Sequence, residues 1–332
     1  MKKTLLTILT CLCSVFVLPA QLHYHFADRE EGLRHLEADS AYFLGLSKNN
    51  IAWRARSSEV SLEELKLLAR NQIVDFTSEE ARELGIIVDS IASILQQVGV
   101  ALSLPDEITF IKSRMGTEFG AGGYTRGTDI YLSSDFVSAV MARKGSERRD
   151  AQMIHLVAHE IFHCLTRNNP PFRQSMYSLI GFMVMDHEID FPLGLRNLLL
   201  TNPDVDRMDN FALFTIEGKE RPCALVTICP KTWEEIEKEN PNANLFQYVS
   251  AALMPLDSLN TWFPTSAASD FRDKVGYNTD YVIAPEECLA DNFGYLVLAK
   301  GMNLKNDSFK SPQLLQDILA TLRQYYPATK QE

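Results

Sequence analysis

The chain has 332 residues, of which 46% are hydrophobic and 23% are charged. These proportions are those of an ordinary globular protein, and they exclude a disordered chain, a collagen-like repeat and a disulfide-dense miniprotein. The 43 acidic and 32 basic residues give a net charge of −11. This charge argues against nucleic acid or an anionic membrane as a partner, because both require a positive protein surface.

The first twenty residues predict a secretory signal peptide. A basic start at Lys2 and Lys3 precedes a mostly apolar run over residues 5–18, and Pro19-Ala20 follows it. This is the order of parts in such a peptide, and the run is short of the roughly 20 residues that a membrane helix needs. We expect an exported protein (periplasmic, cell-surface or secreted) with no stable membrane insertion after cleavage.

Residues 21–100 are expected to form a helical N-terminal region. Apolar residues recur at helical spacing over about 27–46. Two capping boxes then predict helix starts, because a Glu three residues after Ser or Thr satisfies the free amides of a first turn. Ser61 with Glu64 opens a helix toward residue 69, and Thr77 with Glu80 opens one that reaches residue 98.

The remainder of the chain mixes strands and helices, which predicts an α+β fold. Runs rich in β-forming residues predict strands, and helical spacing with Ser or Pro at the first positions predicts helices. The expected strands lie at 108–111 and 129–133, on either side of a Gly-rich turn at 116–123, and within 211–229 and 245–256. The expected helices cover 133–141, 149–166, 172–185, 285–299 and 312–325.

One short motif carries the chemistry. Residues 159–163 read His-Glu-Ile-Phe-His. Two histidines four apart on a helix differ by about 40° around the axis and about 6 Å along it, so both rings can reach one ion. Zinc accepts neutral histidine nitrogens, and Glu160 can act on a water without binding the metal. Uncharged neighbours predict a buried helix, where unpartnered polar groups are costly.

At these residues the sequence resembles the zincin metallopeptidases. The metzincin branch would need glycine at 166 and histidine at 169, where this chain has Thr166 and Asn169. The gluzincin branch takes a glutamate from a downstream helix, often followed four residues later by an aspartate, and Glu287 and Asp291 have that spacing. The resemblance implies one Zn²⁺ held by His159, His163 and Glu287. It also implies that Asp291 orients a histidine ligand, expected to be His159.

Other residues compete for these roles. Glu286 adjoins Glu287 but points about 100° away on the same helix, and Glu188 is a further candidate for the third ligand. His155 stands one turn before His159, where a core or rim position is expected. For His187 we expect a surface or interface position.

The resemblance implies a zincin-like catalytic domain over residues 101–332, with a small mixed sheet, an active-site helix and a strand-containing insertion at about 190–280. Glu160 is expected to be the general base, and Tyr281 and Tyr295 are the candidates for the donor to the oxyanion. Residues 129–133 resemble the edge strand on which zincins align an extended substrate. The predicted function is an exported zinc metallopeptidase acting on a peptide or protein. The alternatives are an inactive zincin-fold binding protein and a zinc hydrolase of a non-peptide substrate.

The cysteines support a weaker hypothesis. Four remain after residue 20, which permits two disulfides in an oxidising compartment. Cys164 and Cys288 each follow a proposed ligand, so we expect a disulfide or a close buried thiol pair. Cys223 and Cys229, six residues apart, are candidates to close a small loop, and buried free thiols are the alternative for all four.

Overall fold

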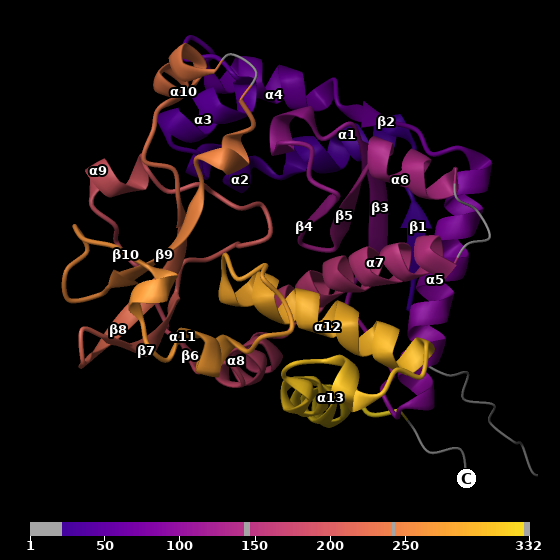
Figure 1. Ribbon diagram of the computed structural model, residues 1–332. Helices are drawn as coiled ribbons and strands as arrows, with labels where there is room; N and C mark the ends of the chain where they lie inside the picture. Colours follow the sequence, from indigo (N-terminus) through magenta and orange to yellow (C-terminus); the bar gives the residue numbers. More distant parts are fainter. Residues whose placement is uncertain (1–21, 143–146, 241–242, 329–332) are drawn as a thin grey trace, which may run out of the picture.

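The computed structural model describes residues 22–142, 147–240 and 243–328. The expected signal peptide therefore lies outside the described residues. Within these ranges, no helix is both long and apolar enough to span a bilayer. The α+β class predicted from the sequence is confirmed, since helices pack around two five-stranded sheets (Figure 1).

The first sheet has the order β1-β3-β5-β4, with β2 also paired to β3. Strands β1 (Tyr24–Phe26) and β5 (Asp129–Ser133) run parallel to β3 (Ile108–Ser113), whereas β2 (Ile73–Val74) is antiparallel to β3. The edge strand is β4 (Gly123–Arg126), antiparallel to β5. The prediction that 129–133 is the edge was wrong, because the end of the Gly-rich segment at 116–123 extends into a strand.

Helices cover both faces of this sheet. Phe110 and Leu132 point into a core shared with α5 (Ser78–Gln97) and α7 (Glu147–Asn168). Their neighbours Ile111 and Tyr131 point to the opposite core, because successive strand residues face opposite sides. That second core is completed by α1 (Arg29–Ala38), α2 (Ser40–Gly45) and α4 (Leu62–Arg70).

The N-terminal region combines helices with strands of the first sheet. Both predicted capping boxes are present, at the starts of α4 and α5. Strands β1 and β2 also come from this region, and both pair with β3. The N-terminal residues are therefore built into the same sheet as the strands that follow residue 100.

Helix α7 lies side by side with α12 (Pro285–Gly301) at the centre of the molecule (Figure 1). Gly294 permits this close approach, since a Cβ there would lie 3.0 Å from the backbone oxygen of His155. Helices α8 (Pro170–Ser178) and α13 (Pro312–Tyr325) pack against α12. Almost all of the first three turns of α12 is buried, including its acidic residues.

The second sheet is antiparallel, in the order β10-β9-β8-β7-β6. Its members are β6 (Phe182–Val184), β7 (Asn210–Ile216), β8 (Lys219–Ile228), β9 (Ser250–Pro255) and β10 (Phe263–Pro264). The helix predicted to reach residue 185 ends at Ser178, because Gly181 takes a positive φ of 79° and turns the chain into β6. The remaining helices are α3 (Lys48–Ala55), α6 (Ser134–Met141), α9 (Leu193–Arg196), α10 (Trp233–Glu239) and α11 (Phe271–Val275).

The disulfides were wrong and the stated alternative holds, since all four cysteines in the described part of the chain are buried free thiols. Cys223 lies in β8 and Cys229 directly follows it. Six residues of extended strand span about 20 Å, far more than the roughly 7 Å that a disulfide bridges between Cα atoms. Cys164 and Cys288 pack as small apolar side chains in one core cluster.

Candidate metal centre

The three predicted ligands converge between α7 and α12. The Nε2 atom of His159 lies 3.0 Å from Oε2 of Glu287, and Nε2 of His163 lies 4.0 Å from the same oxygen. One ligand atom from each residue falls within 4.8 Å of the other two. The exposed fractions of His159, His163 and Glu287 are only 8%, 0% and 1%, so the cluster is enclosed by protein.

The free nitrogen of His163 fits a metal. Its Nε2 is buried and has no hydrogen-bond partner among the described residues. A buried polar atom without a partner is costly, and native structures seldom keep one without a role. Two imidazole nitrogens and a carboxylate oxygen are a usual zinc ligand set that leaves a fourth position open. The residues present therefore fit a zinc ion.

Glu286 holds the other nitrogen of His163. Its Oε1 is 2.9 Å from His163 Nδ1 and also accepts a hydrogen bond from the hydroxyl of Thr166, while its Oε2 accepts one from the hydroxyl of Tyr177. Burial would raise the pKa of Glu286, but the bonds from His163 and the two hydroxyls outweigh it and lower the pKa. A neutral His163 that donates from Nδ1 presents its Nε2 lone pair to the metal position.

Glu286 points away from Glu287 on α12, as the helical geometry predicts. That orientation is what brings it to the far side of the His163 ring. The signal available in the sequence was the Glu286-Glu287 pair at the start of the helix, opposite two histidines that each have a second nitrogen to satisfy.

Asp291 lies between two histidines of α7. Its Oδ1 is 3.8 Å from His159 Nδ1, longer than the hydrogen bond that the resemblance implies, and 3.1 Å from His155 Nε2. Burial would lower the pKa of His159, but Asp291 and Glu287 outweigh it and hold the pKa well above its ordinary value. His155 is directed to Asp291 and to the ring of Tyr295, 4.7 Å away, rather than to the ligand cluster.

Glu160 points from α7 to the edge strand β4. The hydroxyl of Thr125 donates to its Oε2 at 2.8 Å. Gly123 leaves the space that the carboxylate occupies, since a Cβ there would lie 2.6 Å from Oε1. Burial, with the nearby carboxylate of Asp204, raises the pKa of Glu160 to about 7. A carboxyl group with this pKa is suited to accept and return a proton near neutral pH.

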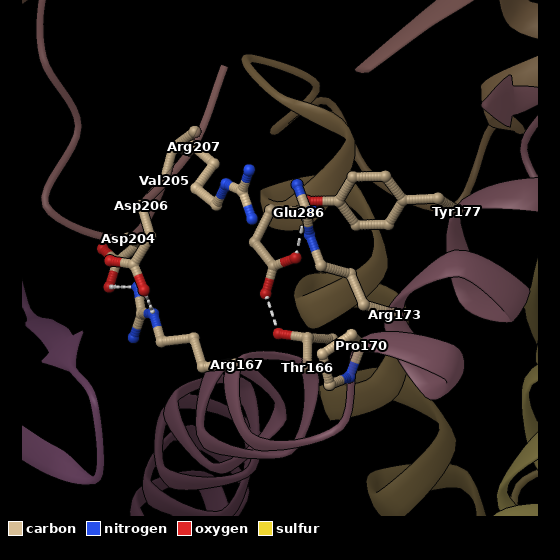
Figure 2. A pocket seen from close by; sticks show the side chains of 10 residues that line it. All are labelled: Thr166, Arg167, Pro170, Arg173, Tyr177, Asp204, Val205, Asp206, Arg207 and Glu286. Atoms are coloured by element: carbon tan, nitrogen blue, oxygen red, sulfur yellow. Dashed lines mark hydrogen bonds and ion pairs between the residues drawn. The ribbon is translucent and has the colours of Figure 1, made fainter. Parts of the chain in front are cut away.

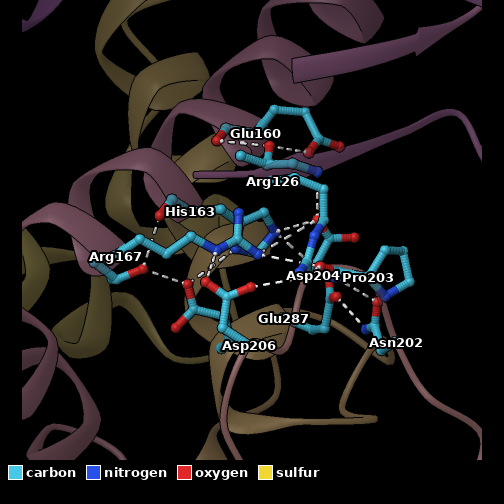
Figure 3. A network of polar contacts seen from close by, with 12 residues as sticks. Arg126, Glu160, His163, Arg167, Asn202, Pro203, Asp204, Asp206 and Glu287 are labelled. Carbon is cyan, nitrogen blue, oxygen red and sulfur yellow. Dashed lines mark hydrogen bonds and ion pairs between the residues drawn. The ribbon is translucent and has the colours of Figure 1, made fainter. Parts of the chain in front are cut away.

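A segment that the sequence argument missed completes the site (Figure 3). Asn202 donates from its side chain to Oε1 of Glu287. Oδ1 of Asp204 lies 4.0 Å from His163 Nε2, and Glu160, His163 and Asp204 form a second group with ligand atoms within 4.8 Å of one another. Burial and the charge of Glu287 raise the pKa of Asp204 to about 8. No periodic pattern or motif in the loop before β7 marked these residues.

A small cavity of about 120 Å³ opens beside the cluster (Figure 2). Glu286 and Asp204 line the cavity, and Figure 2 shows the carboxylate of Glu286 directed toward Tyr177 and Thr166, which also line it. Arg167 and Arg173 also line it, but their ion pairs with Asp206 and Asp209 already balance their charges.

The two candidate tyrosines differ in position. The ring of Tyr281 is 6.2 Å from the ring of His159. Tyr281 is 44% exposed. Partial desolvation of its phenol, together with the charges of Glu287 and Asp204, raises the pKa of Tyr281 above its ordinary value. Tyr295 instead packs between His155 and Phe309, on the side of Asp291 away from the ligand cluster.

The other candidates lie outside the cluster. The Glu188 side chain is 58% exposed and pairs weakly with Arg207 at 3.9 Å. His187 is 76% exposed and contacts only its neighbour Asp186 in the described interactions.

Comparison of the chain with protein-family models, with curated proteins and with solved structures finds no match. The function is therefore inferred from the geometry and chemistry of these residues.

Proposed function

We propose that this protein is an exported zinc-dependent hydrolase of peptide bonds, with one zinc ion held by His159, His163 and Glu287. The observation that carries the proposal is the unpartnered Nε2 of His163, which faces two carboxylates and a second imidazole in an enclosed cluster. Glu160 is the reason for proposing a metallopeptidase rather than a site that only stores metal. Its pKa is raised and its carboxylate is held in place by Thr125, and a storage site would need neither feature.

Each residue has a distinct task in this proposal. When bound, zinc supplies the acidity that makes water a nucleophile near neutral pH and polarises a carbonyl. Glu160 accepts the proton of the attacking water at Oε1 and returns it to the leaving nitrogen, while Thr125 holds Oε2. Glu286 fixes the His163 ring through a hydrogen bond, and the charge of Asp291 lies beside the His159 ring. Tyr281, the nearer tyrosine, donates to the developing oxyanion.

Strand β4 supports a peptide as the substrate. The carbonyl of Gly122 accepts a hydrogen bond from the amide of Ser133. Because every second residue of an antiparallel strand bonds to its partner strand, the backbone N–H and C=O groups of Gly123 and Thr125 point away from β5. An extended peptide can form backbone hydrogen bonds with these outward groups, and it would then lie beside the Glu160 carboxylate.

The test combines metal analysis with a peptide library. Purified protein should contain one zinc ion per chain, and Glu160→Gln should keep the zinc while losing hydrolysis. The carboxylate of Asp204 lies beside His163, next to the proposed metal position. Hydrolysis is therefore measured with the Asp204→Asn variant as well as with wild type. Bound zinc with no hydrolysis by either wild type or Asp204→Asn would refute the peptidase and favour a binding protein or a hydrolase of another bond. N-terminal sequencing of the exported protein tests removal of residues 1–20.

A further inference from the structure

Residues 202–206 occupy the space between the ligand cluster and strand β4. The amide of Thr125 donates to Oδ1 of Asp204 at 2.6 Å, so this acidic side chain takes an outward backbone donor of the edge strand. Arg126 of the same strand donates to the backbone oxygen of Pro203 at 2.8 Å. At the start of the segment, Asn202 donates to Glu287. The segment thus contacts both the strand and a proposed ligand (Figure 3).

Two arginines clamp the end of the segment. Asp206 lies 2.8 Å from Nη1 of Arg126 and 2.7 Å from Nε of Arg167. Arg126 also pairs with Asp39, which ties the clamp to the N-terminal region. Figure 3 shows Asp206 between the two arginines.

Asp204 is placed as a metal ligand would be. Its Oδ1 is 4.0 Å from His163 Nε2, the same separation that Glu287 has from this atom. Two ligand atoms about 2.1 Å from a tetrahedral zinc ion lie about 3.4 Å apart, so the distance from Asp204 to His163 is close to that between two ligands. Asp204 groups with His163 and Glu160 rather than with His159 and Glu287, so its carboxylate would complete the site by moving toward those two residues. The side chain is 7% exposed, and its nearest cation, Arg167, is 4.0 Å away. The Thr125 amide is neutral, so an ionised Asp204 carboxylate lacks a close opposite charge unless a metal is present.

We infer that residues 202–206 are a built-in blocking segment, in which Asp204 occupies the open metal position and covers the strand that would align a peptide. This inference rests on the proposed function. The protein is then latent until the segment is lifted. Lifting it breaks polar contacts rather than an apolar core, because Asp204 is the only residue of the five that is buried and its side chain is polar.

The first experiment measures access to the metal with acetohydroxamate, a small ligand that needs an open position on zinc. It uses the full exported chain loaded with zinc. Asp204→Asn keeps an oxygen for the Thr125 amide but removes the carboxylate ligand. If the segment is closed nine-tenths of the time, opening the site tightens the apparent hydroxamate affinity about tenfold. Asp186→Asn, an exposed aspartate beside His187, is the matched control and should match wild type.

The second experiment loosens the clamp and leaves Asp204 in place. Asp206→Asn removes both arginine ion pairs from a side chain at the surface, so its folding is not at risk. We expect faster hydrogen–deuterium exchange of residues 202–206 and a hydroxamate affinity between those of wild type and Asp204→Asn. In cobalt-loaded protein, the visible absorption spectrum should change in Asp204→Asn because one carboxylate ligand is lost.

The outcomes separate the two proposals. One outcome is that zinc binds and the hydroxamate affinities of wild type, Asp204→Asn and Asp206→Asn agree within about twofold. This result would overturn the blocking segment and leave the metallopeptidase proposal intact. Failure of wild type and both variants to bind zinc would refute the metal centre and the blocking segment together.

Discussion

Gly123→Ala tests whether the position of Glu160 is set by the space beside it. An alanine Cβ would lie 2.6 Å from Oε1 and 3.1 Å from Cδ of Glu160, whereas ordinary contact begins near 3.4 Å. The Cβ cannot retreat, because it would also meet the backbone oxygen of Tyr131 at 3.2 Å. The carboxylate must therefore move by roughly 0.8 Å in a close-packed interior.

A displacement of about 1 Å in a catalytic group can cost about 100-fold in rate. We therefore expect kcat for a peptide substrate to fall between about 10-fold and 100-fold. The zinc affinity should stay unchanged, because no ligand atom lies among the nearest contacts of this Cβ. Overpacking of this size also costs about 1–3 kcal/mol of stability, which thermal unfolding can measure separately.

Gly122→Ala is the matched control, since its Cβ would only touch the Leu156 methyl groups at 3.6 Å. It should retain activity within about twofold and stability within about 0.5 kcal/mol. The reasoning is refuted if Gly123→Ala keeps full activity, or if both alanine variants lose activity equally.

Three further predictions concern the metal and the proton. Glu286→Gln should weaken zinc binding about 10- to 100-fold in competition with a fluorescent chelator, because the charged acceptor of the His163 ring is lost. Tyr281→Phe should lower kcat about 10²-fold or more with little change in KM, while Tyr295→Phe stays near wild type; the reverse order in steady-state kinetics would move the oxyanion role to Tyr295. In the metal-free protein the pKa of Glu160 is raised to about 7 and that of Asp204 to about 8, above their unfolded values of about 4. The folded protein then holds extra protons, so its stability should fall as pH rises from 5 to 8, and calorimetry should find that zinc raises Tm more at pH 8 than at pH 5.

The sequence predicted those parts of the fold that have local causes. The helices that begin at Ser61 and Thr77 follow from side-chain caps that need no tertiary partner. The predicted ligands on α7 and α12 also converge, because regular helical spacing fixes which residues share a face. Gly181, shortly after the end of α8, carried a usable stop signal, but the predicted helix extended past it to residue 185.

The parts that the sequence did not predict depend on contacts between distant segments. The Gly-rich stretch before Arg126 gave no sign that its end pairs with β5 and forms the edge of the sheet. Asp204 lies in an irregular loop, and its place beside His163 is created by contacts with β4 and α7. Glu286 needed knowledge of where the His163 ring turns its second nitrogen, which is a property of the packed helices.

The balance of buried charge gives a separate reason to expect a cation at this site. Glu160, Asp204, Glu286 and Glu287 are each at most 7% exposed, and they surround His163, which is fully buried. Protonation of Glu160 and Asp204 removes part of this buried negative charge, because their pKa values are raised to about 7 and about 8. Protonation of these carboxylates still leaves His163 Nε2 without a partner among the described residues. A divalent ion satisfies the nitrogen and offsets the carboxylates at once, so the same residues that disfavour the metal-free fold at high pH are those that should bind the metal most tightly there.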